Sequence, residues 1–455
     1  MEYLTAVMAQ SPRSTYGSPS AGDPYLPSSG NSGYLVEHYD IDLDYRVTTN
    51  RLVATAVISA RSSQTLERFS LDFAGLVVDK ITVGGERPKK VAQTARKLVI
   101  TPAQALEQGE EFEVVVRYRG APHPVHSEWG DIGWEELADG VLVASQPSGA
   151  SSWFPCNDHP SNKATLTLAV SCESSYAVVS NGTLVSQTTR SGRTQWLFAV
   201  TEPMATYLAT VQIGRYRTLD VVAAPVPTRI HFPPQLARNV ATDFERLGEM
   251  IALFSRLFGP YPFETYAVIV TPDELEIPLE AHRIAVFGRN HVDGAHGSDR
   301  LIAHELAHQW FGNSLTAGVW RDIWLHEGFA CYAEWLWAEA SGRATVESNA
   351  REAWDGLAGL PKNIEIGDPG PRAMFDDRVY KRGALALHAL RNHVGDEAFF
   401  AAIRGYTLAH RFGTVTPRIF AGFVAASGRG EVVDDILRRW VYSQPLPVLA
   451  GAARD

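Results

Sequence analysis

The sequence predicts an α+β protein of several domains, with an N-terminal antiparallel β-sandwich domain followed by a mainly helical domain. Three observations support this prediction. At 455 residues the chain is longer than one ordinary domain. Short runs of alternating polar and apolar residues fill its first half, whereas patterns of helical period fill its second half. Hydrophobic residues make up 45% of the chain, which is enough for a sizeable core.

Residues 1–33 are expected to form a flexible N-terminal tail. From residue 10 to residue 33 the chain is rich in Ser, Gly and Pro and has little that could build a core. A wrapped, extended arm is the alternative for this stretch. The first residues have neither the basic start nor the apolar core of a secretory signal.

The alternating runs predict a β domain over residues 34–225. Two strands are expected at 38–45 and 52–58, joined by the polar turn Thr48-Thr49-Asn50. Further alternating runs lie at 69–73, 98–101, 112–118, 164–170 and 196–200. Because Gly, Asn and Pro turns separate these runs, we expect an antiparallel all-β domain.

Residues 226–455 are expected to form the mainly helical domain. Leu236–Phe258 has the pattern of one long amphipathic helix, which ends at Gly259-Pro260, and Tyr266–Val270 has the pattern of a strand. Helical patterns then cover 299–311, 322–341, 345–357, 379–394, 396–409, 416–427 and 431–442.

Composition excludes several classes of partner. The net charge of −10 is dispersed and leaves no basic stripe for nucleic acid or an anionic membrane. No stretch approaches the roughly twenty apolar residues of a membrane span. The chain has three cysteines, Cys156, Cys172 and Cys331, which form no disulfide framework and suit a reducing compartment. We therefore expect a cytoplasmic protein; the composition says nothing of its oligomeric state.

A metal-binding pattern lies in the helical half. The run from His304 to His308 reads His-Glu-Leu-Ala-His, and Glu327 follows within a second helical pattern. Two imidazoles four residues apart lie on one face of a helix, so both can reach one metal ion. A catalytic zinc takes three protein ligands and keeps one position open, and Glu327 is placed to be the third ligand if the two helices pack together. Glu305 lies off the row of histidines, where it suits contact with a water on the metal.

A surface helix with two histidines is the alternative explanation of this pattern. Both helices are apolar around the charged positions, from Leu301 to Phe311 and from Phe329 to Trp337. Burying His304, Glu305 and Glu327 without a partner would cost free energy, which favours a bound metal.

Several separate motifs resemble those of the gluzincin zinc metallopeptidases typified by aminopeptidase N and leukotriene hydrolase, peptidase family M1. The segment from Trp320 to Ala330 is similar to the family's third-ligand segment. Gln146 and the stretch from Phe154 to Ala164 resemble its β-domain signature, and the stretch from Val379 to Ala384 resembles its tyrosine segment.

This resemblance implies a saddle-like β domain followed by a thermolysin-like catalytic domain. It also implies a short form of the family, because the chain stops soon after Trp440. The expected activity is that of a zinc aminopeptidase which removes N-terminal residues from peptides, with one zinc ion per chain. By the same resemblance, Glu305 is the general base and Tyr380 stabilises the oxyanion.

The resemblance also suggests which groups hold the substrate. The family's Gly-x-Met-Glu-Asn segment, whose glutamate binds the free α-amine, corresponds here to Ile277-Pro278-Leu279-Glu280-Ala281. Glu280 is retained while its neighbours differ, and Pro278 lacks an N–H that an edge strand could offer to a peptide. Glu274 and Glu276 are rivals for the amine. Gln146 matches a position that helps to bind the amine, with an ordinary strand residue as the alternative.

His326 replaces an asparagine beside the third ligand and is expected to be neutral. Two other activities use the same site, those of an endopeptidase and of an epoxide hydrolase, and a third alternative is a non-catalytic scaffold that keeps the fold without the zinc. The scaffold is disfavoured because the three ligands, the base and the tyrosine are all present.

Overall fold

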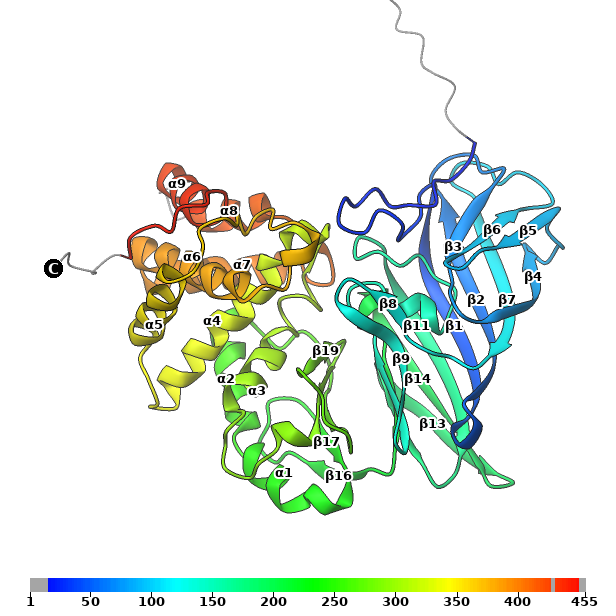
Figure 1. Ribbon diagram of the computed structural model, residues 1–455, viewed down its shortest axis with the longest axis horizontal. Helices are drawn as coiled ribbons and strands as arrows, with labels where there is room; N and C mark the ends of the chain where they lie inside the picture. Colours follow the sequence, from blue (N-terminus) through cyan, green and yellow to red (C-terminus); the bar gives the residue numbers. More distant parts are fainter. Residues whose placement is uncertain (1–14, 427–429, 450–455) are drawn as a thin grey trace, which may run out of the picture.

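The computed structural model describes residues 15–426 and 430–449, which form a β-rich half and a helical half side by side (Figure 1). The β-rich N-terminal domain followed by a helical region is the predicted fold class. Residues 1–14 of the predicted tail lie outside the described residues.

A seven-stranded sheet is the largest element of the N-terminal domain. Its strand order is β13-β14-β11-β1-β2-β7-β4. Buried and exposed residues alternate along its strands because successive side chains point to opposite faces. The strands are β1 (Tyr34–Arg46), β2 (Arg51–Ser62), β4 (Val77–Val83), β7 (Glu111–Gly120), β11 (Lys163–Glu173), β13 (Thr183–Arg190) and β14 (Arg193–Ala205).

Two smaller sheets complete this domain and share its hydrophobic core. One has the order β3-β6-β5 and the other β12-β15-β10-β9-β8. All the pairs in the three sheets are antiparallel except β1 with β11, which pair in parallel. The strands are β3 (Phe69–Asp72), β5 (Lys90–Gln93), β6 (Lys97–Thr101), β8 (Val125–Ser127), β9 (Gly130–Leu137), β10 (Gly140–Ala144), β12 (Ala177–Ser180) and β15 (Val211–Gly214).

Residues 15–33 follow the alternative of a wrapped arm and not that of a flexible tail. Tyr25 and Leu26 are 7% exposed and belong to the core of the helical half. The Tyr25 hydroxyl donates a hydrogen bond to the Asp368 carboxylate, and it accepts one from the Gly370 N–H at 2.7 Å. The Ser- and Pro-rich composition hid these anchors, because two buried aromatic and aliphatic side chains are enough to fix an extended segment.

A five-stranded sheet opens the second half, with the order β16-β17-β18-β20-β19. The predicted domain boundary at 225/226 falls inside it, between β16 and β17. The short strand β19 is at one edge and pairs with β20 alone. The strands are β16 (Arg217–Asp220), β17 (Thr228–Phe232), β18 (Tyr266–Val270), β19 (Leu279–Ala281) and β20 (Ile284–Phe287).

The helices follow the predicted periodicity closely, with one exception. They are α1 (Ala237–Asp243), α2 (Leu247–Phe258), α3 (Asp299–Ala307), α4 (Trp324–Ala340), α5 (Val346–Ala358), α6 (Asp377–Val394), α7 (Asp396–Ala409), α8 (Pro417–Ala425) and α9 (Gly430–Trp440). The single helix predicted for 236–258 is wrong, since the chain breaks between α1 and α2. At the break the Asp243 carboxylate accepts hydrogen bonds from the N–H groups of Gly294 and His296, so tertiary contacts override the local pattern.

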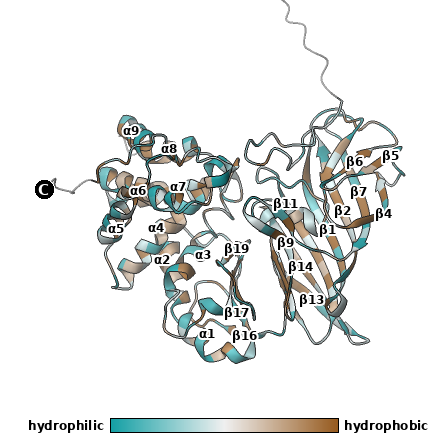
Figure 2. Cartoon of the chain, viewed as in Figure 1, coloured by the Kyte–Doolittle hydropathy of each residue, from teal (hydrophilic) through white to brown (hydrophobic). Residues whose placement is uncertain are grey.

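Figure 2 shows hydrophilic stretches on the outer helices α5 and α9, as expected for helices that bury one face only. Among the residues that the structure describes, no helix combines the length and the apolar character that crossing a membrane requires.

Candidate metal centre

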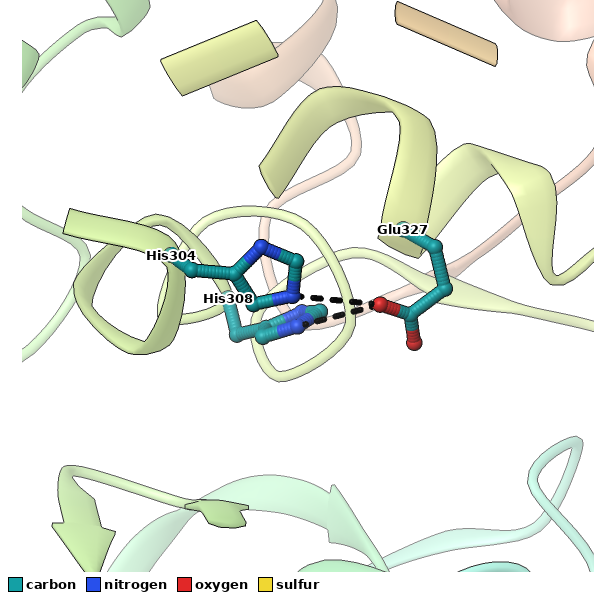
Figure 3. Close-up of side chains that lie close together, drawn as sticks. All are labelled: His304, His308 and Glu327. Atoms are coloured by element: carbon teal, nitrogen blue, oxygen red, sulfur yellow. Dashed lines mark ion pairs between the residues drawn. The ribbon is translucent and has the colours of Figure 1, made fainter. Parts of the chain in front are cut away.

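Three predicted ligands come together from two helices. His304 lies in α3, His308 caps its C-terminal end, and Glu327 lies in the first turn of α4. The Nε2 atoms of His304 and His308 lie 3.3 and 3.5 Å from the same Glu327 oxygen, Oε2 (Figure 3). Both rings therefore point at one carboxylate oxygen, as the spacing predicted.

The geometry fits a zinc ion. Ligand atoms about 2.0–2.1 Å from a tetrahedral metal lie roughly 3.3 Å from one another, close to the separations seen here. Burial lowers the pKa of His304, but hydrogen bonds to Glu327 and Glu334 outweigh it and raise the pKa to about 9. Burial also lowers the pKa of His308, but the negative charges of Glu280 and Glu327 outweigh it and raise the pKa to about 10. The cluster thus favours positive charge, which a divalent cation supplies.

The other ring nitrogen of each histidine, Nδ1, also has a hydrogen-bond partner. The Nδ1 atom of His304 lies 2.8 Å from Glu334 Oε1, and that of His308 lies 3.0 Å from the Phe311 carbonyl oxygen. A proton on each Nδ1 makes these hydrogen bonds and leaves each Nε2 free as a ligand. Glu334 also accepts two hydrogen bonds from Arg300 Nη1, at 3.1 and 3.0 Å.

Sequence reasoning missed Glu334. It stands seven residues after Glu327 in the same helix, so the two carboxylates share one face. A buried acidic residue two turns beyond a metal ligand is a signal that could have identified it.

Glu305 lies in the same buried cluster. It is 4% exposed, and its Oε2 atom has no hydrogen-bond partner among the described residues. Ligand atoms of Glu305, Glu280 and His308 all lie within 4.8 Å of one another. Burial raises the pKa of Glu305 to about 7, against the effect of the two imidazoles. An unpaired buried carboxylate beside a metal site can accept a proton from a small molecule bound there.

Tyr380 reaches the centre from α6. Its ring lies nearly parallel to that of His304, with centroids 5.9 Å apart. Burial, and then the charges of Glu327 and Glu280, raise the pKa of Tyr380 well above its usual value, so the hydroxyl stays protonated and can donate.

A contact between two glycines lets α6 approach so closely. A Cβ atom on Gly328 would lie 2.9 Å from the Cα of Gly383, well inside the normal contact distance. Gly328 follows Glu327, and Gly383 stands one turn after Tyr380. The pair of glycines therefore sets the separation of Glu327 and Tyr380.

Glu280 and Gln146 meet across the two domains. Glu280 is in edge strand β19, and Gln146 follows strand β10 of the N-terminal domain. Gln146 Nε2 donates to Glu280 Oε1 at 2.6 Å. Glu274 and Glu276 are exposed, and Glu274 pairs with Arg289 at 3.1 Å. Of the three glutamates, Glu280 is therefore the one next to Glu305 and the predicted ligand His308.

The altered segment 277–281 still contributes an edge strand, formed by its last three residues, Leu279–Ala281. The Ala281 carbonyl accepts hydrogen bonds from Asn313 Nδ2 at 2.8 Å and Gln309 Nε2 at 3.2 Å. The next turn contains Arg283, which is 2% exposed and forms an ion pair with Glu202 of the N-terminal domain. These contacts fix the strand even though Pro278 precedes it.

His326 is neutral, as predicted. Burial lowers its pKa to about 3, and its Nε2 atom accepts a hydrogen bond from the Ala317 N–H at 2.8 Å. His326 therefore anchors the loop between α3 and α4 to the start of α4, next to Glu327.

The β-domain signature also contacts the second domain. Lys163 Nζ donates to the backbone carbonyls of Asn313 at 3.1 Å, Ser314 at 2.8 Å and Gly413 at 3.3 Å. Its role is to join the two domains behind the metal centre, which the sequence did not reveal.

Comparisons with known proteins agree with this arrangement. The family model described as Peptidase M1 N-terminal domain matches residues 35–208, and the one described as Peptidase family M1 domain matches residues 243–440. The chain is 25% identical to human endoplasmic reticulum aminopeptidase 1 over 409 residues, which are 82% of this chain and 44% of that protein. It is 26% identical to the leucyl aminopeptidase of Saccharolobus solfataricus over 82% of this chain and 49% of that protein. The chain thus spans less than half the length of these two relatives.

Solved structures match over more of their length. The chain is 32% identical to the M1 zinc metallopeptidase from Deinococcus radiodurans, with a TM-score of 0.86 over 94% of this chain and 99% of that one. A mutant of that enzyme bound to a Tyr-Ser-Ala substrate gives 31% identity and the same TM-score, over 95% and 100% of the chains. With both domain models matched and this identity over nearly a whole solved chain, the protein belongs to peptidase family M1.

Proposed function

We propose that this protein is a zinc-dependent aminopeptidase, a hydrolase that removes N-terminal residues from peptides. The contact that supports the proposal most directly is that of Glu280 with the metal centre. Its carboxylate lies within 4.8 Å of ligand atoms of Glu305 and His308. A carboxylate so placed can bind an α-ammonium group one residue from the scissile bond, because unlike charges at such distances attract strongly in a buried site.

One zinc ion per chain would be held by His304, His308 and Glu327. When bound, it supplies a Lewis acid for the scissile carbonyl and acidifies the attacking water. Glu305 takes a proton from that water at its unpaired Oε2 and passes it to the leaving amine. Tyr380 donates its hydroxyl proton in a hydrogen bond to the oxygen on which negative charge develops.

The substrate side is formed by both domains. Glu280 binds the free amine, and Gln146 holds the Glu280 carboxylate in place through the 2.6 Å hydrogen bond. The partners are therefore peptides with a free N-terminus, and the dispersed negative charge does not suit nucleic acid or an anionic membrane as a partner. The buried free thiols Cys156, Cys172 and Cys331 are consistent with a cytoplasmic role in peptide catabolism.

The test compares one peptide with a free and with an acetylated N-terminus. An aminopeptidase cleaves the free form at its first peptide bond and leaves the acetylated form intact, as mass spectrometry of the products shows. Equal cleavage of the two forms would instead indicate an endopeptidase. Zinc content measured on the same sample is expected to be one ion per chain, and its absence would indicate a scaffold.

A further inference from the structure

The turn between strands β19 and β20 contains a residue that its backbone conformation does not favour. Arg283 is the second of the two residues that join these strands, and its φ is 66°. Glycine adopts such a left-handed conformation without strain, whereas a side chain crowds the backbone there. An arginine at this position costs conformational free energy, which points to a function of its side chain.

The Arg283 side chain joins this turn to the β domain. It is 2% exposed, and its Nη2 atom donates to both carboxylate oxygens of Glu202 in β14, one of them at 2.6 Å. Its Nη1 atom donates to Thr183 Oγ1 at 3.2 Å. The Glu202 side chain is itself only 12% exposed. Charge-assisted hydrogen bonds between buried groups hold a defined geometry, because they are directional and because a lost partner leaves a buried charge unpaired.

The backbone of the turn is held from both domains. Asn181 Nδ2 of the β domain donates to the His282 carbonyl oxygen at 2.9 Å. On the other side, the Arg283 N–H donates to Gln309 Oε1 at 2.9 Å. Gln309 directly follows His308, the residue that caps α3. The turn thus links the β domain to the helix that carries two of the predicted metal ligands.

The proposed amine anchor lies next to this turn. Glu280 stands three residues before Arg283, in β19, which is on the side of the helical half that faces the β domain (Figure 1). Its carboxylate lies within 4.8 Å of ligand atoms of Glu305 and His308. Because β19 is short and pairs with β20 alone, few ladder hydrogen bonds fix it. The contacts of the turn therefore decide where Glu280 lies.

We propose that Arg283 is a positioning residue for peptide hydrolysis: its ion pair with Glu202 fixes β19 and so sets the position of the substrate's amine relative to the metal ligands. Through this contact the β domain determines which peptide bond reaches the metal, although the three predicted ligands lie in the helical half. The inference rests on the proposed function, since it takes the amine to bind at Glu280. A contact that only stabilised the fold would affect all ligands of the site equally, whereas a positioning contact affects those with a free amine.

The test measures by calorimetry how two compounds bind to the zinc-loaded protein: leucine hydroxamate, and the same hydroxamate with an acetylated amine. Both can reach the metal, but only the first offers an ammonium group to Glu280. The unmodified protein is expected to bind the free-amine compound about 10²-fold more tightly, as a charge-assisted contact implies. Arg283→Gly suits the backbone of the turn and leaves no buried cation, and it should lower this ratio to about 10. The dissociation constant of the acetylated compound should stay within about twofold of its unmodified value, which is roughly 0.4 kcal/mol.

Three further variants sharpen the test. Glu202→Gln neutralises the other half of the ion pair and should also lower the ratio to about 10. Arg283→Lys keeps the positive charge but not the forked geometry, and it should retain a ratio of about 30. Asp220→Asn is the matched control, because Asp220 forms an exposed ion pair with Arg229, at 3.1 Å, in the same sheet. This control should keep the ratio of the unmodified protein.

The outcomes separate the two proposals. An unchanged ratio in both Arg283→Gly and Glu202→Gln would overturn the positioning role, and so would an equal loss of affinity for the two compounds. A ratio near 1 in the unmodified protein would reject the amine site, and with it both proposals. If the unmodified protein discriminates between the compounds as expected but cleaves no free-amine peptide, the proposed function alone fails.

Discussion

The metal end and the amine end of the site are built in different ways. His304, His308 and Glu327 come from α3 and α4, two helices of one domain that pack directly together. Glu280 and Gln146 come from an edge strand and from the other domain. Local helical geometry therefore sets the chemistry, whereas the relative position of two domains sets the recognition of the substrate.

This difference predicts distinct consequences for substitutions at the two ends. A change at the metal end should lower turnover of every substrate by a similar factor. A change at the amine end should act mainly on substrates with a free amine. The predictions below follow from the largest expected effect to the smallest.

Glu305→Gln should have the largest effect. It removes the proposed base while keeping the size of the side chain, so kcat should fall about 10³-fold, within the range for general acid–base catalysis. Steady-state kinetics on an aminoacyl chromogenic amide measures the loss. Elemental analysis should still find zinc in the variant, because Glu305 is not one of the three ligands. Retention of more than a tenth of the activity would remove Glu305 from the mechanism.

Glu280→Gln should reduce kcat/KM for free-amine peptides about 10²-fold, because a charge-assisted hydrogen bond to the ammonium group becomes a neutral one. Glu274→Gln is the matched control, since that carboxylate is exposed and pairs with Arg289. Measurement of kcat/KM for one peptide series with both variants tests this prediction. The assignment of the amine anchor is wrong if the control loses as much as Glu280→Gln.

Gly328→Ala should destabilise the protein by about 1–3 kcal/mol through overpacking, because its new Cβ would lie 2.9 Å from Gly383. Denaturant unfolding measures this change. Gly422→Ala, in α8, has no heavy atom within 4 Å of its new Cβ and should gain up to about 1 kcal/mol. In Gly328→Ala the added methyl group should push α4 and α6 apart. Turnover by this variant should therefore also fall, without any change in the preference for a free amine. Equal stability of the two variants would show that the helix contact tolerates a methyl group.

Gln146→Ala should have the smallest effect, about a fivefold loss of kcat/KM for free-amine peptides, since one hydrogen bond is worth roughly 1 kcal/mol. Its effect should shrink when Glu280 is already replaced, because the two groups act through each other. A double-mutant cycle on one peptide tests this coupling. Strictly additive losses would mean that Gln146 acts independently of Glu280.

The same comparison explains what the sequence could predict. The predicted ligands His304 and His308 lie four residues apart, at helical spacing, so their geometry follows from helical periodicity alone. The contact of Gln146 with Glu280 joins residues 134 positions apart. No local pattern encodes such a contact, and the resemblance to a family suggested only that both residues bind the substrate's amine.

Other features depended on tertiary contacts and could not be predicted. The predicted helix over 236–258 breaks where Asp243 caps two distant N–H groups. Lys163 looked like part of a signature, but its hydrogen bonds are to carbonyl groups about 150 or more positions later. The position of Glu334, by contrast, could have been predicted from the sequence, because helical spacing from Glu327 is enough to place it on the same face of α4.

The wrapped arm imposes an order on biosynthesis. Tyr25 belongs to the core of the helical half, and its hydroxyl contacts Asp368, which the ribosome adds 343 residues later. The part of the arm around Tyr25 therefore cannot complete its contacts while the β domain is emerging, and its place is completed only when most of the chain has been made. The segment around Tyr25, although made early, is thus among the last parts of the described chain to reach its final position.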